Sequence, residues 1–165
     1  MEEIMKEIKP PKIAPIEGIS IFLAGSIEMG VAEDWQSYVA KRMESFECTI
    51  FNPRRAEWDS SWKQEQKQEQ FNEQVNWEMS YLEKSDIIFM YLAPETKSPI
   101  SLLELGLHAA SGKMIVVCPD GFWRKGNVDI VCARHGIPMY EDIESGIGAL
   151  MTKARQIGSE RSFTI

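Results

Sequence analysis

Two glutamates stand in apolar surroundings, where an acid needs a reason. Glu104 interrupts the oily stretch SPISLLELGLHAASGK (98–113), and Glu78 lies inside VNWEMSYL (75–82). Burying an unpaired carboxylate is costly. If both acids reach one crevice about 5 Å apart, their repulsion at an effective dielectric near 20 is about 3 kcal/mol, or roughly two pKa units. One acid would then hold a proton near neutral pH while the other stays charged.

A carboxylate nucleophile beside a proton-donating acid is suited to exchange at a glycosidic bond, where one attacks the anomeric carbon and the other assists the leaving group. Two structural alternatives stay open. Ser101 and Glu104 fit a capping box, in which the acid only ties up a backbone N–H. Glu78 fits a solvated acid on a helix face. Against the capping box, a helix beginning at Ser101 would exclude Pro99, which suits the first helical position after a Ser98 cap.

The elements that position these acids follow from the hydrophobic pattern. Short apolar runs predict buried strands, and apolar residues at helical spacing predict helices between them. We therefore predict an α/β, single-domain, flavodoxin-like doubly wound sheet of five parallel strands in the order 2-1-3-4-5, with a ligand crevice at the carboxyl ends of the strands. The predicted strands are 19–24, 49–51, 86–92, 114–118 and 138–140, and the predicted helices are 32–46, 71–82, 100–110 and 143–157.

Length and composition limit the domain organisation and the kind of partner. A chain of 165 residues suits one hydrophobic core. Residues 1–18 mix charges with three prolines and predict a flexible N-terminal arm before a domain over 19–165. The net charge of -7 argues against binding a nucleic-acid polymer, which needs a basic face. No apolar run approaches the roughly 20 residues of a membrane span, so we expect no membrane partner.

The three cysteines, Cys48, Cys118 and Cys132, are widely spaced and lack metal-ligand spacing. They are typical of reduced, buried thiols in a cytoplasmic protein. The histidines, His108 and His135, lack triad partners at a recognisable spacing and more readily serve structural or surface roles.

Three loops should converge at the carboxyl edge of the sheet: AGSIEMG (24–30), NPRRAEWD (52–59) and APETKSP (93–99). In the first loop, Gly25, Ser26 and Gly30 would let backbone N–H groups approach an anion or a ribose. A plain turn between a strand and a helix would look the same. Around the second loop and the next helix, tryptophans could stack on a planar base, although aromatic side chains more often fill cores. These tryptophans are Trp58, Trp62 and Trp77.

Taken together, IFLAGSIEMG, NPRRAEWD, VNWEMSYLEKSDIIFMYL and SPISLLELGLHAASGK resemble the nucleoside 2-deoxyribosyltransferase superfamily over roughly residues 19–140. The most specific part is the ELG motif (104–106), with the strand SDIIFMYL a fixed distance upstream. The resemblance implies a flavodoxin-like fold without a metal or organic cofactor. It also implies an enzyme that moves 2-deoxyribose between bases through a covalent glycosyl-glutamate.

By position, the resemblance makes Glu104 the nucleophile and Glu78 the acid, usually Asp, that contacts the departing base. Asn127 approximately matches a residue supplied to the neighbouring subunit, which implies a homo-oligomer, a dimer or higher, with shared active sites. The chain also departs from the pattern. Phe22 replaces a tyrosine that orients the nucleophile, and Ser98 replaces an Asp that helps read the base. A serine there is similar to the related 2'-deoxynucleoside 5'-phosphate N-hydrolases, whose serines hold the phosphate.

We therefore expect a small nucleoside or nucleotide as the partner and 2-deoxyribose transfer as the leading function. One alternative is N-glycosidic hydrolysis of a (deoxy)nucleoside 5'-monophosphate, with Arg54 or Arg55 pairing with the phosphate. Another is a non-catalytic nucleotide-binding sensor or assembly module on the same fold. Besides the two acids, the expected substrate-binding residues are Gly25, Ser26, Asn52, Arg54, Trp58, Asp59, Trp77, Ser98 and Asn127.

Overall fold

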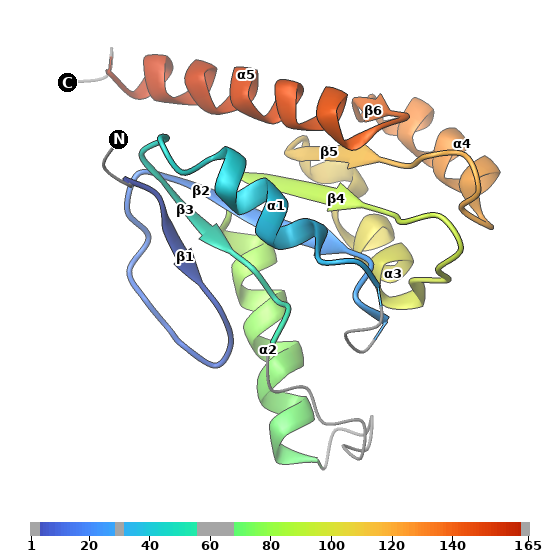
Figure 1. Ribbon diagram of the computed structural model, residues 1–165, viewed down its shortest axis with the longest axis horizontal. Helices are drawn as coiled ribbons and strands as arrows, with labels where there is room; N and C mark the ends of the chain where they lie inside the picture. Colours follow the sequence, from blue (N-terminus) through green and yellow to red (C-terminus); the bar gives the residue numbers. More distant parts are fainter. Residues whose placement is uncertain (1–3, 29–31, 56–67, 163–165) are drawn as a thin grey trace.

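The computed structural model describes residues 4–28, 32–55 and 68–162, which form one parallel sheet with helices on both faces (Figure 1). The strand order is β1-β3-β2-β4-β5-β6, and every neighbouring pair is parallel. The five predicted strands occur in the predicted order, with a sixth strand added at one edge. The strands are β1 (Lys6–Ile8), β2 (Ile19–Gly25), β3 (Cys48–Phe51), β4 (Ile87–Tyr91), β5 (Met114–Val117) and β6 (Met139–Tyr140).

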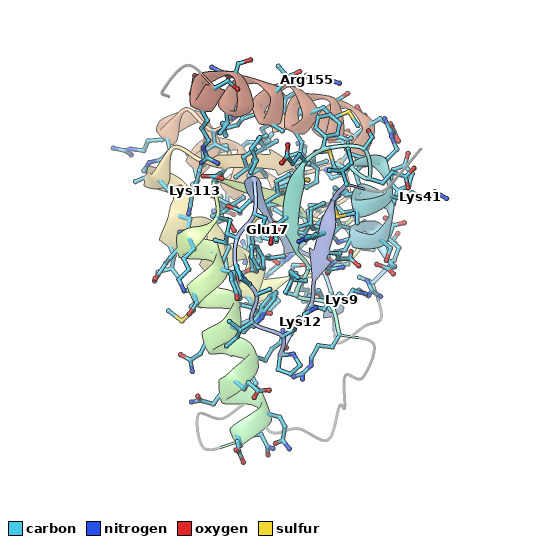
Figure 2. All side chains as sticks on the ribbon, turned by 90° about the vertical axis from the view of Figure 1, so that its left-hand side faces the viewer. Lys9, Lys12, Glu17, Lys41, Lys113 and Arg155 are labelled. Carbon is cyan, nitrogen blue, oxygen red and sulfur yellow. The ribbon has the colours of Figure 1, made fainter. Side chains whose placement is uncertain are left out.

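The additional strand, β1, comes from the segment that the sequence predicts to be a flexible arm. It pairs with β3, with Lys6 opposite Thr49, and Met5 and Ile8 are buried beside it. The chain after β1 then passes α2, and Figure 2 labels Lys12 on this segment. The indole N–H of Trp77 on α2 donates to the carbonyl of Lys12 at 2.8 Å. At least residues 6–8 are therefore part of the sheet.

The helices divide into two layers, which gives the doubly wound arrangement its two hydrophobic cores. α1 and α5 pack on the face to which Ile21 and Leu23 point, whereas α2, α3 and α4 pack on the face of Phe22 and Ala24. This split follows from the alternation of side chains along a strand. α4 is an element that the sequence does not predict. The helices are α1 (Trp35–Arg42), α2 (Glu69–Lys84), α3 (Pro99–His108), α4 (Lys125–His135) and α5 (Ile143–Ser162).

Of the helices in the described ranges, not one is both long and apolar enough to cross a membrane.

Gly146 allows α5 to lie close against the sheet. A Cβ built at this position would lie 2.2 Å from Cγ2 of Val117 and 3.3 Å from ring atoms of Phe89. We expect Gly146→Ala to lower the free energy of unfolding by about 1–3 kcal/mol, because the added methyl overpacks the core. Urea denaturation would measure the loss.

Gly148, two residues further on, supplies the matched control. It is exposed, and a Cβ there would meet no described atom within 4 Å. Gly148→Ala should raise the free energy of unfolding by about 0.5–1 kcal/mol through helix propensity. If both alanine variants proved equally stable, α5 would not be held by close packing at Gly146.

Candidate active site

The start of α3 decides what Glu104 can do. The helix begins at Pro99, with Ser98 at the cap position in a left-handed conformation (φ 45°, ψ 53°). The amide of Leu102 donates to the carbonyl of Ser98 at 3.1 Å, so Ser101 already lies inside the first turn. The placement of Pro99 and Ser98 is confirmed, and the capping box is wrong. Glu104 is therefore one and a half turns into the helix, too far from its end to serve as a cap.

Glu104 and Glu78 act on each other from neighbouring helices. Both side chains are partly buried, Glu78 in the middle of α2 and Glu104 in α3. Burial raises the pKa of Glu104 to about 8, and repulsion from the Glu78 carboxylate contributes to the rise. Burial also raises the pKa of Glu78, to about 7. The fold thus brings the two predicted acids within electrostatic reach, in a setting that resists two negative charges.

A glutamine makes the pair unequal. Nε2 of Gln74 donates to Oε1 of Glu78 at 3.0 Å and to the carbonyl of Pro53 at 3.0 Å. The first bond lowers the pKa of Glu78 against the effect of burial. Across the described ranges, the carboxyl of Glu104 receives no hydrogen bond. The single negative charge therefore rests preferentially on Glu78, and the proton on Glu104. Sequence reasoning missed Gln74, although its position four residues before Glu78 on one helix was a usable signal.

Three hydroxyl groups form a cluster beside the start of α3. Oγ of Ser26 lies 2.6 Å from Oγ of Ser98 and 2.9 Å from Oγ1 of Thr96, and the last two lie 2.9 Å apart. The amide of Ala93 donates to Oγ of Ser26 at 2.8 Å. The first and third predicted loops therefore do converge. Ser98 and Glu104 are six residues apart, which is about 9 Å along a helix axis.

The backbone conformation and close packing at position 25 require a glycine. The φ of Gly25 is 136°, and a Cβ there would lie 2.1 Å from the carbonyl oxygen of Tyr91 on β4. The amide of Ser26 donates to that same carbonyl at 2.9 Å. Glycine is needed so that the two strands can stay together while the chain turns toward the hydroxyl cluster. Gly30, from the same predicted loop, lies outside the described residues.

Asn52 and Arg54 hold the second loop in place. Asn52 is fully buried, and its Oδ1 accepts a hydrogen bond from the amide of Arg54 at 3.0 Å. The Arg54 guanidinium donates to the carbonyl of Glu33 at 2.9 Å and to the carbonyl of Ala32. These contacts tie the end of β3 to the segment leading into α1. The guanidinium of Arg55, 3.9 Å from Glu73, is mostly buried.

Trp77 fills the core instead of lining an open crevice. Only 5% of it is exposed. Its ring centroid lies 6.1 Å from Phe22, 6.1 Å from Phe51 and 4.9 Å from Tyr81. That packing leaves little surface on which a base could stack. Trp58, Asp59 and Trp62 lie outside the described residues.

Asn127 is exposed on α4. Together with Trp123 and Arg124 it borders a groove of about 340 Å³ between α3 and α4. The apolar lining consists of Leu102, Leu105, Gly106, Val128 and Val131. Neither Glu78 nor Glu104 is among the residues that line this groove.

The doubly wound sheet makes this an α/β domain of the class in which ligands bind at the carboxyl ends of the strands. The model of the nucleoside 2-deoxyribosyltransferase-like family matches residues 18–122, from just before β2 into the loop between β5 and α4. The chain belongs to this family, which confirms the resemblance and associates the protein with nucleosides or nucleotides. Both acids and the hydroxyl cluster fall within the matched span. No curated protein sequence matches the chain.

Because the pKa of Glu104 is raised in the folded protein, this residue should make the free energy of unfolding depend on pH. In an unfolded chain the carboxyl loses its proton near pH 4.5, whereas in the folded protein it keeps the proton until about pH 8. The folded state therefore binds more protons between these values, and stability falls as the pH rises through this window. We expect Glu104→Gln to be more stable than the unmodified protein at pH 8 by about 1 kcal/mol or more, and nearly equal to it at pH 5.

Urea denaturation at the two pH values would measure the difference. Glu69→Gln, at an exposed position in the first turn of α2, is the control and should show the same small effect at both values. If the effect of Glu104→Gln on stability did not change with pH, the pKa of Glu104 would not be raised by its surroundings.

Proposed function

We propose that this protein transfers 2-deoxyribose between nucleobases through a covalent intermediate on Glu104. The observation that carries the proposal is the unequal Glu78–Glu104 pair, partly buried at the crevice of a member of this family. A nucleophile and a proton donor are the two groups that such a reaction needs.

In the proposed first step, the Glu104 carboxylate attacks C1' of a 2'-deoxynucleoside, and the bond between C1' and the base nitrogen breaks. Protonated Glu78 gives its proton to the departing base. In the second step, an incoming base attacks C1', the ester bond to Glu104 breaks, and Glu78 takes the proton from the incoming base. The sugar lacks a 2'-hydroxyl, which makes the oxocarbenium-like transition state easier to reach.

Substrate binding has to reverse the proton distribution of the free protein. Without substrate, the Gln74 hydrogen bond favours the anion of Glu78 and leaves the proton on Glu104. A base nitrogen that accepts a hydrogen bond from Glu78 would favour its protonated form. Positive charge developing at C1' would favour the anion of Glu104. The same two contacts thus place each group in its active state.

Hydrolysis of a nucleoside 5'-monophosphate is the second candidate. It is favoured by the Ser26 and Ser98 hydroxyls at the end of α3 that is remote from the base. It is weakened by Arg54, whose guanidinium donates to the carbonyls before α1. In this reaction water would replace the incoming base, and deoxyribose 5-phosphate would be released.

Incubation with deoxyinosine and adenine would test the transfer, with chromatography to detect deoxyadenosine. We expect exchange by the unmodified protein and a loss of at least about 10³-fold in Glu104→Gln. Mass spectrometry of protein quenched with deoxyinosine alone should locate a sugar adduct on Glu104. The control is Glu69→Gln, which should retain full activity.

Each other outcome points to a different function. Release of deoxyribose 5-phosphate from deoxyinosine monophosphate, without base exchange, would support hydrolysis. Ligand binding that is unchanged in Glu104→Ala, with neither reaction detected, would support a nucleotide-binding sensor.

We further propose that the protein is a homo-oligomer in which a second copy covers α3 and α4. Large apolar side chains are exposed on these helices and around the groove between them, more than an isolated surface usually carries in one place. Filling such a groove with side chains of a second copy would remove them from water. Asn127 at its border would then face the neighbouring subunit. The exposed apolar residues are Ile100, Leu103, Leu107, Trp123 and Ile130.

Leu107→Glu should therefore convert the oligomer to monomers, because it places a charge in the centre of the proposed contact. Light scattering coupled to size-exclusion chromatography would measure the mass. Ile13→Glu changes another apolar position, which is more exposed than Leu107 (83% against 60%) and far from these helices in the sequence, and should leave the mass unchanged. A monomeric unmodified protein would contradict the proposal outright.

A further inference from the structure

A glutamate of the first loop occupies the backbone amides at the start of α3. Oε1 of Glu28 accepts hydrogen bonds from the amide of Ser98 at 2.7 Å and from the amide of Lys97 at 3.0 Å. Backbone amides at a helix start are the groups that usually bind an anion such as a phosphate. Here the chain's own carboxylate takes both of them.

Glu28 binds the same residue, Ser98, that belongs to the hydroxyl cluster. Ser98 is bound by Glu28 through its amide and by Ser26 through its hydroxyl, so the carboxylate borders the hydroxyl cluster. This cluster lies about 9 Å along α3 from Glu104. A deoxyribose with C1' at Glu104 and its base toward Glu78 on α2 would extend its 5' end in this direction. Resting on the function proposed above, the 5' substituent would meet Glu28.

We propose that Glu28 is a specificity residue that excludes a 5'-phosphate, so that the substrate is a 2'-deoxynucleoside with a free 5'-hydroxyl. A 5'-phosphate carries about two negative charges, which the Glu28 carboxylate would repel. Both backbone amides that could bind the phosphate are already bonded to Glu28. A hydroxyl carries no charge, and it can donate to the carboxylate or bond to the serine hydroxyls. The reaction that supplies this substrate must therefore be one that yields unphosphorylated nucleosides, such as removal of a 5'-phosphate.

Glu28→Gln removes the negative charge of the side chain and keeps its size and shape. The Gln side-chain oxygen can still accept both amide hydrogen bonds, so the loop keeps its contacts while the negative charge disappears. Glu28→Lys goes further and replaces the charge by its opposite. Glu95→Gln is the matched control, because Glu95 is an exposed acid in the third loop that also has a positive φ, 65° against 48° at Glu28.

The deciding measurement is calorimetric binding of deoxyinosine and of deoxyinosine 5'-monophosphate, which does not require turnover. We expect the unmodified protein to prefer the nucleoside by at least about 100-fold. The preference should fall by about tenfold in Glu28→Gln and further in Glu28→Lys, mainly through tighter nucleotide binding, and should stay unchanged in Glu95→Gln. Added salt should weaken the preference of the unmodified protein and of Glu95→Gln, and should have little effect on that of Glu28→Gln.

The kcat/KM values for base exchange from the two substrates should follow the same order. Equal binding of nucleoside and nucleotide by the unmodified protein, or a preference that Glu28→Gln leaves intact, would overturn the role of Glu28 and leave the proposed transfer standing. Selective binding without any exchange would instead refute the transfer while supporting Glu28. Binding of neither compound would refute both.

Discussion

The site depends on one constraint: two carboxyl groups lie where only one can ionise at low cost. α2 leads from β3 to β4 and α3 from β4 to β5, so right-handed crossovers place both helices on the same face of the sheet. The acid on each helix then lies within electrostatic reach of the other. In water such a pair would titrate almost independently, but partial burial raises both pKa values and makes each charge depend on the other.

The residues around Glu78 and Glu104 decide which of the two acids holds the proton. Gln74 offers a hydrogen bond to Glu78 alone, while the strand beneath presents Phe22, whose ring packs on Trp77. An apolar ring cannot donate a proton or a hydrogen bond to Glu104. Among the described residues, Gln74 donates a hydrogen bond to Glu78 and no group donates one to Glu104, so the two chemically identical acids differ in proton affinity. In the free protein this difference favours the anion of Glu78 and the protonated form of Glu104, the reverse of the forms that the proposed transfer requires.

The sequence predicted the elements that have strong local patterns and missed those defined by tertiary contacts. The five strands β2 to β6 were predicted from apolar runs and the start of α3 from Pro99, and these predictions are confirmed. β1 is a three-residue edge strand with two charges, and α4 carries too few apolar residues at helical spacing to stand out. Within the site, Glu78 and Glu104 were predicted by their apolar surroundings. Residue type alone could not show that Trp77, Asn52 and Arg54 make structural contacts, because stacking, amide and guanidinium groups serve either purpose.

Two different groups of polar side chains lie along α3 at the carboxyl edge of the sheet. Near Glu104 the acids are partly buried, so a neutral, planar base can interact there without competing with water. About 9 Å away, at the start of the helix, the groups are hydroxyls and an exposed carboxylate. A ligand that is neutral at both ends matches this gradient, because it places no anion beside Glu28 and no second charge beside the pair. A ligand with a phosphate would need positive charge there, and the guanidinium of Arg54 in the second loop is already bound to backbone carbonyls. Charge at the remote end of the crevice, rather than the chemistry at Glu104, therefore selects between a nucleoside and a nucleotide.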